Sequence, residues 1–594
     1  MNIFDFLITQ PIMWLVDIFY SISHNYVIAI ILFSLAIKII LFPLSYWAQS
    51  QSVKLAIMKP ELDDIKAYLS HDIRTMMKEQ KKLYKKHKYN SFASMLPLLL
   101  QIPIIIGVIR GLDASNILAT PPENILIPIV SALSAFLLCY AQNATNVLAK
   151  EMTFFAKWGL AIFLTIFSFY FTLVSGIGFG IYWILGNLLG IAVQFICNAI
   201  LKPKQYVTYE ILPPPKKDRE LIKRQKQKQA EDMKKFKKAK KNLVFYSESS
   251  GFYKYYKGMI EYVLNNSKIK IHYLTSDIDD QVFKINHPNF IPYYCGSKKL
   301  ITVLMELDCK VAVFTMPDLQ KYQYKRSIVN KNIEYVYVHH GFNSLTLTIK
   351  KNSLDYFDTV FCFGQHYNDE IRAMEQFYGS KEKKLVNTGY DLYQQLKEKY
   401  VPRTNEKEII MIAPSWQRDN ILEICIDDIM KNLDSEKYKV LIRPHPEFIK
   451  RFPKKIELLK KKFGDALQLD FSVDILNADV IISDWSSVAW EFSYTTNKPA
   501  LFINTPMKIM NPDYDKFGLT PLEISIRDKI GKTIEINEIK NINQALEEIK
   551  NIKNPQEIIE KMMYDNSKAS EISGKYLIEE VKNAVKQQQQ QENK

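Results

Sequence analysis

The sequence predicts two different parts, an α-helical membrane domain followed by an α/β protein. Residues 1–201 contain several long apolar runs, whereas residues 243–580 alternate short apolar segments with amphipathic ones. Between them, residues 202–242 hold 15 Lys or Arg and 5 Asp or Glu, so that this segment accounts for most of the net charge of +15. A chain of 594 residues is long enough for several domains.

Composition excludes several classes of protein. Hydrophobic residues make up 47% and charged residues 24%, values that exclude wholesale disorder and a fibrous repeat. The six cysteines show no CxxC spacing, which argues against a disulfide scaffold or a zinc site, and no metal site is expected. Because the basic residues follow directly after the last apolar run, they indicate a membrane surface rather than nucleic acid. The alternative is a solvated linker.

Five apolar segments are long enough to cross a bilayer: 27–46, 93–112, 124–143, 157–175 and 179–200. Residues 2–23 precede them and contain Asp5 and Asp17. These charges favour a helix in the membrane interface, with a sixth span as the alternative.

The loop 49–91 is long and basic. Its apolar residues recur at spacings of three and four, which predicts a helical hairpin. Basic loops lie on the cytoplasmic side of a membrane. Five spans then place the N-terminus outside and everything after residue 201 in the cytoplasm.

Lys38 lies near the middle of the first predicted span. A charge at this depth costs about 2.5 to 3.5 kcal/mol and indicates a functional site that faces a wet cavity. The alternative is a lysine that reaches the interface and has no role. Gln101 is a weaker polar candidate, since it could equally join helices.

The second part reads as two Rossmann-like halves. Nine strand-like segments alternate with helical ones: 243–247, 269–275, 311–315, 335–339, 359–364, 409–414, 438–446, 479–484 and 500–504. A polar stretch near residue 400 separates the halves, giving domains 243–400 and 401–580 and suggesting the GT-B architecture. Residues 581–594, rich in glutamine, are expected to be disordered.

Polar clusters follow four of these strands, where ligands bind in parallel sheets. Histidines at such ends supply a base near neutral pH, arginines neutralise phosphate, and serines at a helix start present N–H groups to an anion. Each residue type also has a structural alternative: the histidines could form structural hydrogen bonds, the arginine a surface salt bridge, and the serines a helix cap. The clusters are His339-His340-Gly341, Ser415-Trp416-Gln417-Arg418, Arg443-Pro444-His445 and Ser486-Ser487 with Glu491.

The membrane half resembles the YidC/Oxa/Alb family of membrane protein insertases. The resemblance rests on IILFSLAIKIILFPLS (30–45), KPELDDIKAYL (59–69), MLPLLLQIPIIIGVIRGL (95–112) and GFGIYWILGNLLGI (178–191). It implies a multi-pass protein of the bacterial plasma membrane that inserts nascent membrane proteins without a cofactor. Lipids, the ribosome and the Sec translocon are the further partners it suggests. Lys38 stands where the family usually has an arginine, in a groove to which we also assign Gln101.

The second part resembles the CDP-glycerol glycerophosphotransferase family, which builds polymers such as teichoic acids. The resemblance implies that His340 is the base and that CDP-glycerol, a donor substrate, is needed without metal or cofactor. It further implies that a hydroxyl of a lipid-linked glycerol-phosphate acceptor attacks the β-phosphorus and that CMP leaves. It also implies that His445 is a second catalytic residue, which helps to hold the phosphates of the leaving CMP. The donor-binding residues that it implies are Gly341, Asn343, Ser344, Ser415, Trp416, Arg418, Arg443, Ser486, Ser487 and Glu491.

The sequence departs from the transferase pattern at three places. Glu491 replaces an aspartate that binds glycerol, Arg418 is shifted by one inserted residue, and Leu392 stands where an arginine is usual. These departures leave three readings open. The chain is an insertase fused to a transferase, a membrane-anchored transferase for another activated polyol or sugar, or an insertase with a degenerate transferase-like module.

Overall fold

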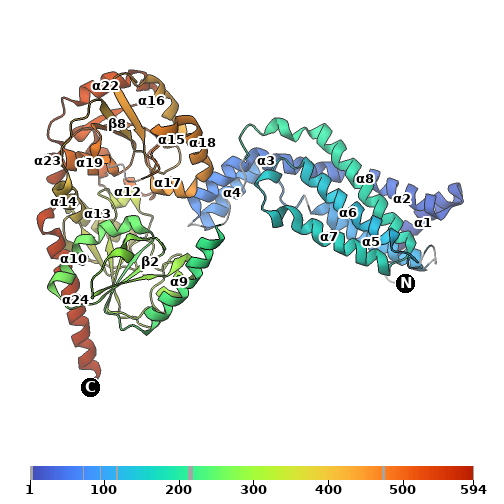
Figure 1. Ribbon diagram of the computed structural model, residues 1–594, viewed down its shortest axis with the longest axis horizontal. Coiled ribbons are helices and arrows are strands. Elements are labelled where there is room, and N and C mark those ends of the chain that lie inside the picture. Colours follow the sequence, from blue (N-terminus) through green and yellow to red (C-terminus); the bar gives the residue numbers. More distant parts are fainter. Residues whose placement is uncertain are drawn as a thin grey trace. The chain divides into compact units, whose positions relative to one another are not determined.

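The computed structural model of the protein describes residues 5–70, 73–93, 95–114, 118, 120–211, 218–470 and 475–592 (Figure 1). The chain divides into two compact units, residues 1–216 and residues 217–594. We call them the membrane unit and the α/β unit and describe each by itself.

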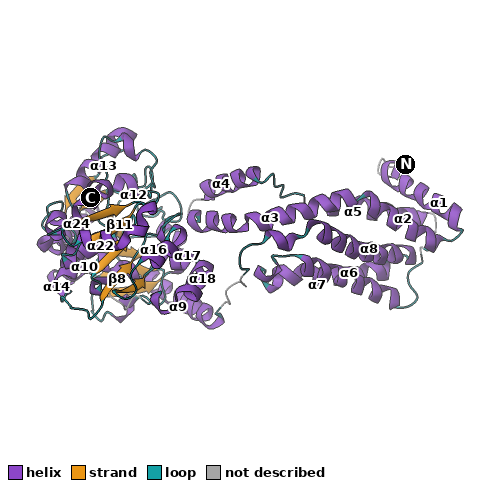
Figure 2. Cartoon of the chain, turned by 90° about the horizontal axis from the view of Figure 1, so that it is seen from above, coloured by secondary structure: helices purple, strands orange, loops and turns teal. Residues whose placement is uncertain are grey.

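The membrane unit is built from helices in its described residues, as Figure 2 shows. A short π-helical turn, Asp5–Thr9, leads into the first helix. The α-helices are α1 (Gln10–Ser23), α2 (Tyr26–Ile40), α3 (Phe42–Leu69), α4 (Ile73–Lys86), α5 (Leu96–Ala114), α6 (Leu126–Thr145), α7 (Phe154–Val174) and α8 (Ile177–Leu201).

The first predicted span, 27–46, is broken rather than continuous. Helix α2 ends at Ile40, and α3 begins at Phe42 with a bend of 49° between them. Pro43 lies in the first turn of α3. Proline fits a first helical turn but lacks the N–H that a helix interior needs, so a new helix starts here.

Four described helices are long and apolar enough to cross a membrane: Asp5–Ser23, α6, α7 and α8. The bent pair α2 and α3 adds a fifth if it is one span. Helix α5 occupies the second predicted span, 93–112. Because Asp5–Ser23 also meets the length and composition of a span, the interfacial position of this helix stays a prediction.

The predicted hairpin within 49–91 is present. The later turns of α3 pack against α4 through a buried cluster of Met58, Leu62, Ile65 and Leu83. The hairpin is also tied to the rest of the unit, since Lys59 forms an ion pair with Glu151 at 3.1 Å.

The first half of the α/β unit is a parallel sheet of seven strands in the order β3-β2-β1-β4-β5-β6-β7. Figure 1 shows its strands in green and yellow-green, with α10 (Lys257–Asn266) beside α24 (Ala569–Glu592). The strands are β1 (Leu243–Ser247), β2 (Ile271–Thr275), β3 (Phe290–Tyr294), β4 (Val311–Phe314), β5 (Glu334–Val338), β6 (Thr359–Cys362) and β7 (Lys384–Asn387). The order reverses between β1 and β4, which is where such sheets bind ligands.

The second half is a parallel sheet of five strands in the order β12-β11-β10-β8-β9. Its order reverses between β8 and β10. The strands are β8 (Glu408–Ile412), β9 (Tyr438–Ile442), β10 (Val480–Ser483), β11 (Ala500–Ile503) and β12 (Gly531–Ile534). Two Rossmann-like sheets confirm the GT-B type of architecture and all nine predicted strands.

Two terminal segments of the α/β unit differ from prediction. About half of the predicted linker 202–242 is helix α9 (Arg219–Lys238). This helix buries Phe236, and its Asp232 accepts a hydrogen bond from the Tyr294 N–H at 2.8 Å. The predicted disordered tail is helical as far as Glu592. Lysine and glutamine are good helix formers, and buried Tyr576, Leu577 and Val581 anchor the helix.

The helices that connect the strands near the candidate site are short. They include α12 (Leu345–Thr348), α13 (Gln365–Tyr378), α14 (Asp391–Lys399), α17 (Pro446–Arg451), α19 (Val488–Thr496), α20 (Leu522–Ser525) and α21 (Arg527–Ile530). Each follows a strand end and carries one or more of the residues discussed below.

Candidate active site

All four predicted clusters lie at the carboxyl ends of strands. His339 and His340 follow β5, Ser415 follows β8, and Arg443 follows β9. Ser486 and Ser487 lie between β10 and α19. The fold therefore gathers the clusters at the ligand-binding edge of the two sheets.

His340 is held in one tautomer by the first half. Its Nδ1 lies 3.1 Å from the Thr315 carbonyl oxygen, at the end of neighbouring strand β4. A carbonyl only accepts, so Nδ1 carries the hydrogen and Nε2 keeps its lone pair. Burial, with the nearby charges of Lys508 and Lys254, lowers the pKa of His340 to about 4. The ring is therefore neutral at pH 7, with Nε2 able to accept a proton.

His445 is held in the opposite tautomer. It is the N-cap of α17, where its Nδ1 accepts the N–H of Glu447 at 3.1 Å. The hydrogen of the neutral ring is therefore on Nε2, which makes it a donor. Burial and the charge of Lys508 lower the pKa of His445 to about 3. His340 thus offers an acceptor and His445 a donor.

His339 has a structural role beside the site. The side chain is buried, and its Nδ1 lies 2.7 Å from the Tyr337 hydroxyl. Its Nε2 lies 2.6 Å from Oδ1 of Asn343. These two bonds fix the Asn343 side chain. A Cβ at Gly341 would lie 3.3 Å from Asn343 Nδ2, so the amide nitrogen is directed toward the backbone after His340.

Two residues at the start of helix α19, in the second half, contact the first half near His340 and Gly341. A Cβ at Gly341 would lie only 3.1 Å from Ser487 Oγ. Ser487 occupies the N-cap position of α19 but makes no capping hydrogen bond with its side chain, so its hydroxyl faces Gly341 instead. Glu491, one turn further along α19, forms an ion pair with Lys254 of the first half at 3.7 Å.

Ser344 is not placed to bind a nucleotide. It is fully buried, and its N–H donates to Oε1 of Glu523 at 3.1 Å. Its hydroxyl accepts the N–H of Leu522 at 2.6 Å, and its carbonyl accepts the hydroxyl of Thr348. Because these groups are already paired, Ser344 joins the two halves instead of meeting a ligand.

Two residues of the Ser415 cluster are oriented by the protein, and one is not. Ser415 is buried, and its N–H donates to Oδ1 of Asp484 at 2.7 Å, across the point where the strand order reverses. The ring of Trp416 lies 4.8 Å from the guanidinium carbon of Arg451. Arg418 is exposed and makes no hydrogen bond or ion pair with the described part of the chain.

Lys508 is a site residue that the sequence prediction missed. It lies beyond β11, with its Nζ 5.4 Å from the centre of the Trp416 ring, and its charge lowers the pKa of His339, His340 and His445. Burial lowers its own pKa. No carboxylate lies within 4.0 Å of Lys508 among the described residues. The strand-end rule that selected the other clusters would also have selected this loop.

The Lys508 loop is anchored on three sides. Trp485 Nε1 donates to the Thr505 carbonyl at 2.8 Å, and Gln417 Nε2 donates to the Pro506 carbonyl at 2.6 Å. The N–H of Met510 donates to the Leu347 carbonyl of the first half at 2.9 Å. The backbone around Lys508 is therefore fixed, which keeps the ammonium near the histidines.

The membrane unit holds the other predicted site residues. Lys38 is half-buried on α2, and a Cβ at Gly190 of α8 would lie 3.8 Å from its Nζ. No carboxylate pairs with Lys38 in the described structure. Gln101 lies half-buried on α5 and makes no hydrogen bond with Lys38.

A polar chain joins three helices of the same unit. Gln49 of α3 donates to Gln194 of α8 at 2.8 Å, and Gln194 donates to Thr145 of α6 at 2.7 Å. These bonds satisfy polar groups between otherwise apolar helices.

In the residues that the structure describes, no group of three or more His, Cys, Asp or Glu is placed to hold a metal ion.

Two family models match separate parts of the chain. Residues 18–205 match the family described as 60Kd inner membrane protein. Residues 230–509 match CDP-Glycerol:Poly(glycerophosphate) glycerophosphotransferase. The two regions correspond to the membrane unit and to most of the α/β unit.

Similar curated proteins match the membrane unit. The membrane protein insertase YidC of Magnetococcus marinus is 29% identical over 206 residues, 32% of this chain and 35% of that protein. The insertase YidC of Shewanella piezotolerans is 31% identical over 206 residues, 33% of this chain and 37% of that protein. The chain thus spans little more than a third of the length of these relatives.

Solved structures align with the other part. A structure of the wall teichoic acid polymerase TagF covers 61% of this chain and 95% of its own, at 14% identity and a TM-score of 0.39. A UDP-GlcNAc 2-epimerase of Methanocaldococcus jannaschii covers 56% of this chain and 98% of its own, at 14% identity and a TM-score of 0.38. The family matches are the more specific finding: the chain is a fusion of a YidC/Oxa-type membrane region with a CDP-glycerol glycerophosphotransferase-type region.

Proposed function

We propose that the α/β unit transfers glycerol phosphate from CDP-glycerol to a hydroxyl of a lipid-linked or polymer acceptor and releases CMP. The observation that carries this proposal is the tautomer of His340, whose Nε2 is left as an acceptor in the residue before Gly341, and Gly341 faces Ser487 of the opposite half. A neutral base that faces an anion-binding helix start is what phosphoryl transfer to a hydroxyl requires.

The residues at the site account for the proton that is transferred, and CMP is the leaving group. Nε2 of His340 takes the proton of the acceptor hydroxyl while the hydroxyl oxygen attacks the β-phosphorus. The bond from that phosphorus to the bridging oxygen breaks, and CMP leaves with the electron pair. Most of the catalysis is positioning and charge stabilisation.

The phosphate oxygens require donors and positive charge, and four groups supply them. His445 donates from Nε2, Ser487 offers its hydroxyl, and Arg443 and Lys508 add charge. Lys508 compensates for the arginine that is absent at Leu392. Glu491, held by Lys254, is assigned to the hydroxyls of the glycerol.

We also propose that the membrane unit inserts nascent membrane proteins, with lipids and the insertion machinery as partners. Lys38 carries this second proposal, because a half-buried cation without a carboxylate needs a polar ligand. The positive-inside rule then puts the α/β unit in the cytoplasm, where it would meet a lipid-linked acceptor on the inner leaflet.

The transferase proposal is tested by CMP release from the full-length protein in nanodiscs. CDP-glycerol and a glycerol-phosphate-primed lipid are supplied to wild type and to His340→Ala, and the thermal midpoint of each is measured as a folding control. We expect release by wild type and a loss of about a hundredfold or more in the variant.

A different result separates the alternatives. If folded wild type releases no CMP, CDP-glycerol is rejected as donor with this acceptor, and other nucleotide-activated polyols and sugars are tried next. Equal release by wild type and by a folded His340→Ala protein would reject His340 as the base.

A further inference from the structure

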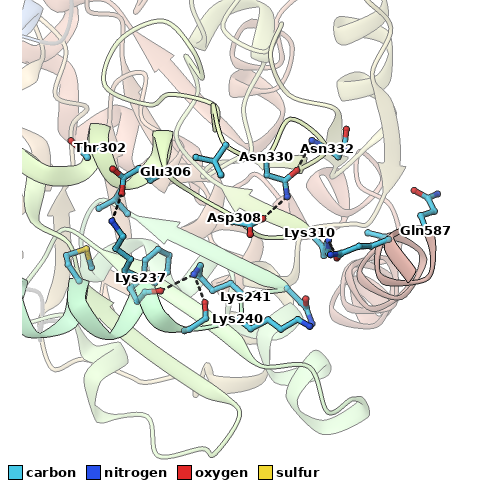
Figure 3. A pocket seen from close by; sticks show the side chains of 18 of the residues that line it. Lys237, Lys240, Lys241, Thr302, Glu306, Asp308, Lys310, Asn330, Asn332 and Gln587 are labelled. Atoms are coloured by element: carbon cyan, nitrogen blue, oxygen red, sulfur yellow. Dashed lines mark hydrogen bonds and ion pairs between the residues drawn. The ribbon is translucent and has the colours of Figure 1, made fainter. Parts of the chain in front are cut away.

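A cavity lies at the opposite edge of the first sheet from the candidate active site. Its volume is about 1240 Å³. It is lined by the end of α9, by α11 (Gly296–Met305), by residues that precede β1, β4 and β5, and by the last turns of α24. Figure 3 shows these side chains around the opening. Strands of four or five residues separate this edge from the histidines, a distance of about 15 Å.

The cavity is strongly basic. Its lining contains five lysines but only two carboxylates, Glu306 and Asp308. Glu306 is paired with Lys237 at 3.7 Å, and Asp308 accepts the Asn330 amide at 2.8 Å (Figure 3). The five lysines are Lys237, Lys240, Lys241, Lys299 and Lys310.

Two of these lysines are not neutralised by the protein. Lys240 and Lys299 are exposed, and the ammonium group of neither makes a hydrogen bond or an ion pair with the described residues. Lys241, by contrast, donates to the carbonyls of Phe236 and Ala239 and so caps α9. The cavity therefore offers at least two free ammonium groups to an anionic ligand.

The rim of the cavity is apolar as well as basic. Val329 lines the cavity with 63% of its surface exposed, and its neighbour Ile328 is 62% exposed. Ile301 of α11 (Gly296–Met305), next to the lining residue Thr302, is 41% exposed. Exposed aliphatic side chains beside lysines are typical of a surface that enters the headgroup region of a bilayer.

We propose that this cavity binds the phosphate head group of an anionic phospholipid, with Lys240 and Lys299 on the phosphate and Ile328 and Val329 against the lipid. A soluble phosphate would match the lysines but not the apolar rim. The same chain carries helices long enough to span a membrane, so phospholipid is a ligand that this protein would meet. The site is separate from the proposed transferase chemistry.

Photo-crosslinking of the full-length protein in nanodiscs tests this site. A benzophenone amino acid replaces Val329 and, as a matched control, the equally exposed Val401. Discs contain either phosphatidylglycerol or phosphatidylcholine. We expect Val329 to label phosphatidylglycerol several times more than phosphatidylcholine, and Val401 to label both weakly.

Charge-neutral variants then test the lysines. Lys240→Gln with Lys299→Gln should lower the labelling at position 329 by about fivefold for each lysine removed. Lys529→Gln with Lys540→Gln, two exposed lysines of the second half, should not change it. Neither pair removes a hydrogen bond seen in the described structure, so both proteins are expected to fold, and their thermal midpoints check this.

Three results would overturn the proposal. Equal labelling of both lipids would mean contact without recognition of charge, and unchanged labelling in the Lys240/Lys299 variant would remove the lysines from the site. Loss of labelling when millimolar glycerol phosphate is added would identify a soluble phosphate as the preferred ligand.

Discussion

Lys38 of the membrane unit and Lys508 of the α/β unit are both half-buried and have no carboxylate partner in the described structure, but the two differ in how visible they are in the sequence. Lys38 interrupts a long apolar run, so the charge is conspicuous. Lys508 lies between Met507 and Ile509 in the loop after β11 and resembles any surface lysine, although its place after a strand end could have pointed to it. The comparison teaches that an unpaired cation indicates a ligand in both settings. The apolar run reveals Lys38 directly, whereas Lys508 is found only if every strand end is followed.

The largest effect is expected from neutralising Lys508. Lys508→Gln should lower kcat/KM for CDP-glycerol by about ten- to a hundredfold, because a hydrogen bond to a charged group contributes about 1.5 to 3 kcal/mol. Lys508→Arg keeps the charge and should recover part of the rate. CMP release at varied donor concentration measures both. Lys529→Gln serves as the control, and an equal loss there would make the effect one of net charge only.

The same variant should change the pH dependence. A base must be neutral, so activity falls as pH drops through the pKa of His340, which is about 4 in the free protein. Lys508 helps to depress that value, so its removal raises the pKa of His340. The acidic limb of kcat/KM in Lys508→Gln should therefore move to higher pH. A limb that stays in place would mean that Lys508 does not face the base.

Substitution of Lys38 should separate function from stability in the membrane unit. A central charge costs about 2.5 to 3.5 kcal/mol, so Lys38→Leu should leave the thermal midpoint in nanodiscs unchanged or higher. Insertion of a single-span client into proteoliposomes should nevertheless fall, and Lys38→Arg should restore it. Protease protection of the client measures insertion. Full insertion of the client by Lys38→Leu would reject the proposed role of Lys38 and favour the view that the membrane unit is only an anchor.

A smaller effect is expected from two buried acids around Ser344, of which Glu523 joins the two halves of the α/β unit. Glu370 accepts the Leu345 N–H at 2.6 Å, and Glu523 accepts the N–H of Ser344. Burial raises the pKa of both carboxyls, so the folded state holds protons that the unfolded state releases. Stability is then lost as pH rises from the unfolded pKa, about 4.3, through the raised folded values.

The test is the thermal midpoint of Glu523→Gln from pH 5 to 9. The amide keeps the shape of the neutral acid but cannot ionise, so its midpoint should fall less between pH 5 and 7 than that of wild type. A parallel decline in both proteins over this range would show that burial does not raise the pKa of Glu523.

Strands inside the sheets were predictable, but three of the four edge strands were not. All nine predicted strands exist, including β9 at an edge, while the edge strands β3, β7 and β12 were missed. An interior strand is buried on both faces and reads as an apolar run. An edge strand need not be: β3 contains Pro292, β7 reads Lys-Leu-Val-Asn, and β12 begins with Gly531.

Site residues that directly follow a strand were predictable from the sequence. Residues whose role depends on contacts with distant parts of the chain were not. His340, His445 and Ser487 lie where the strand-end rule put them. The family resemblance predicts that Ser344 binds the donor, but its contacts with Glu523 and Leu522 come from a distant part of the chain. The bend at Leu41 likewise reflects Pro43, which hydropathy alone does not register.

The smallest effect is expected from the polar chain of the membrane unit, and it provides the contrast to Lys38. Gln194 has both of its ends paired, to Gln49 and to Thr145. Hydrogen bonds between membrane helices contribute about 0.6 kcal/mol on average. Gln194→Leu should therefore lower the thermal midpoint in nanodiscs slightly and leave client insertion unchanged.

This pattern is the reverse of that expected for Lys38→Leu, which should lower insertion without lowering stability. A satisfied polar group stabilises helix packing, whereas an unsatisfied cation costs stability and is kept for a ligand. If Gln194→Leu lowered insertion as much as Lys38→Leu, the polar chain and the cation would belong to one groove, and pairing within the protein would no longer distinguish a structural side chain from a functional one.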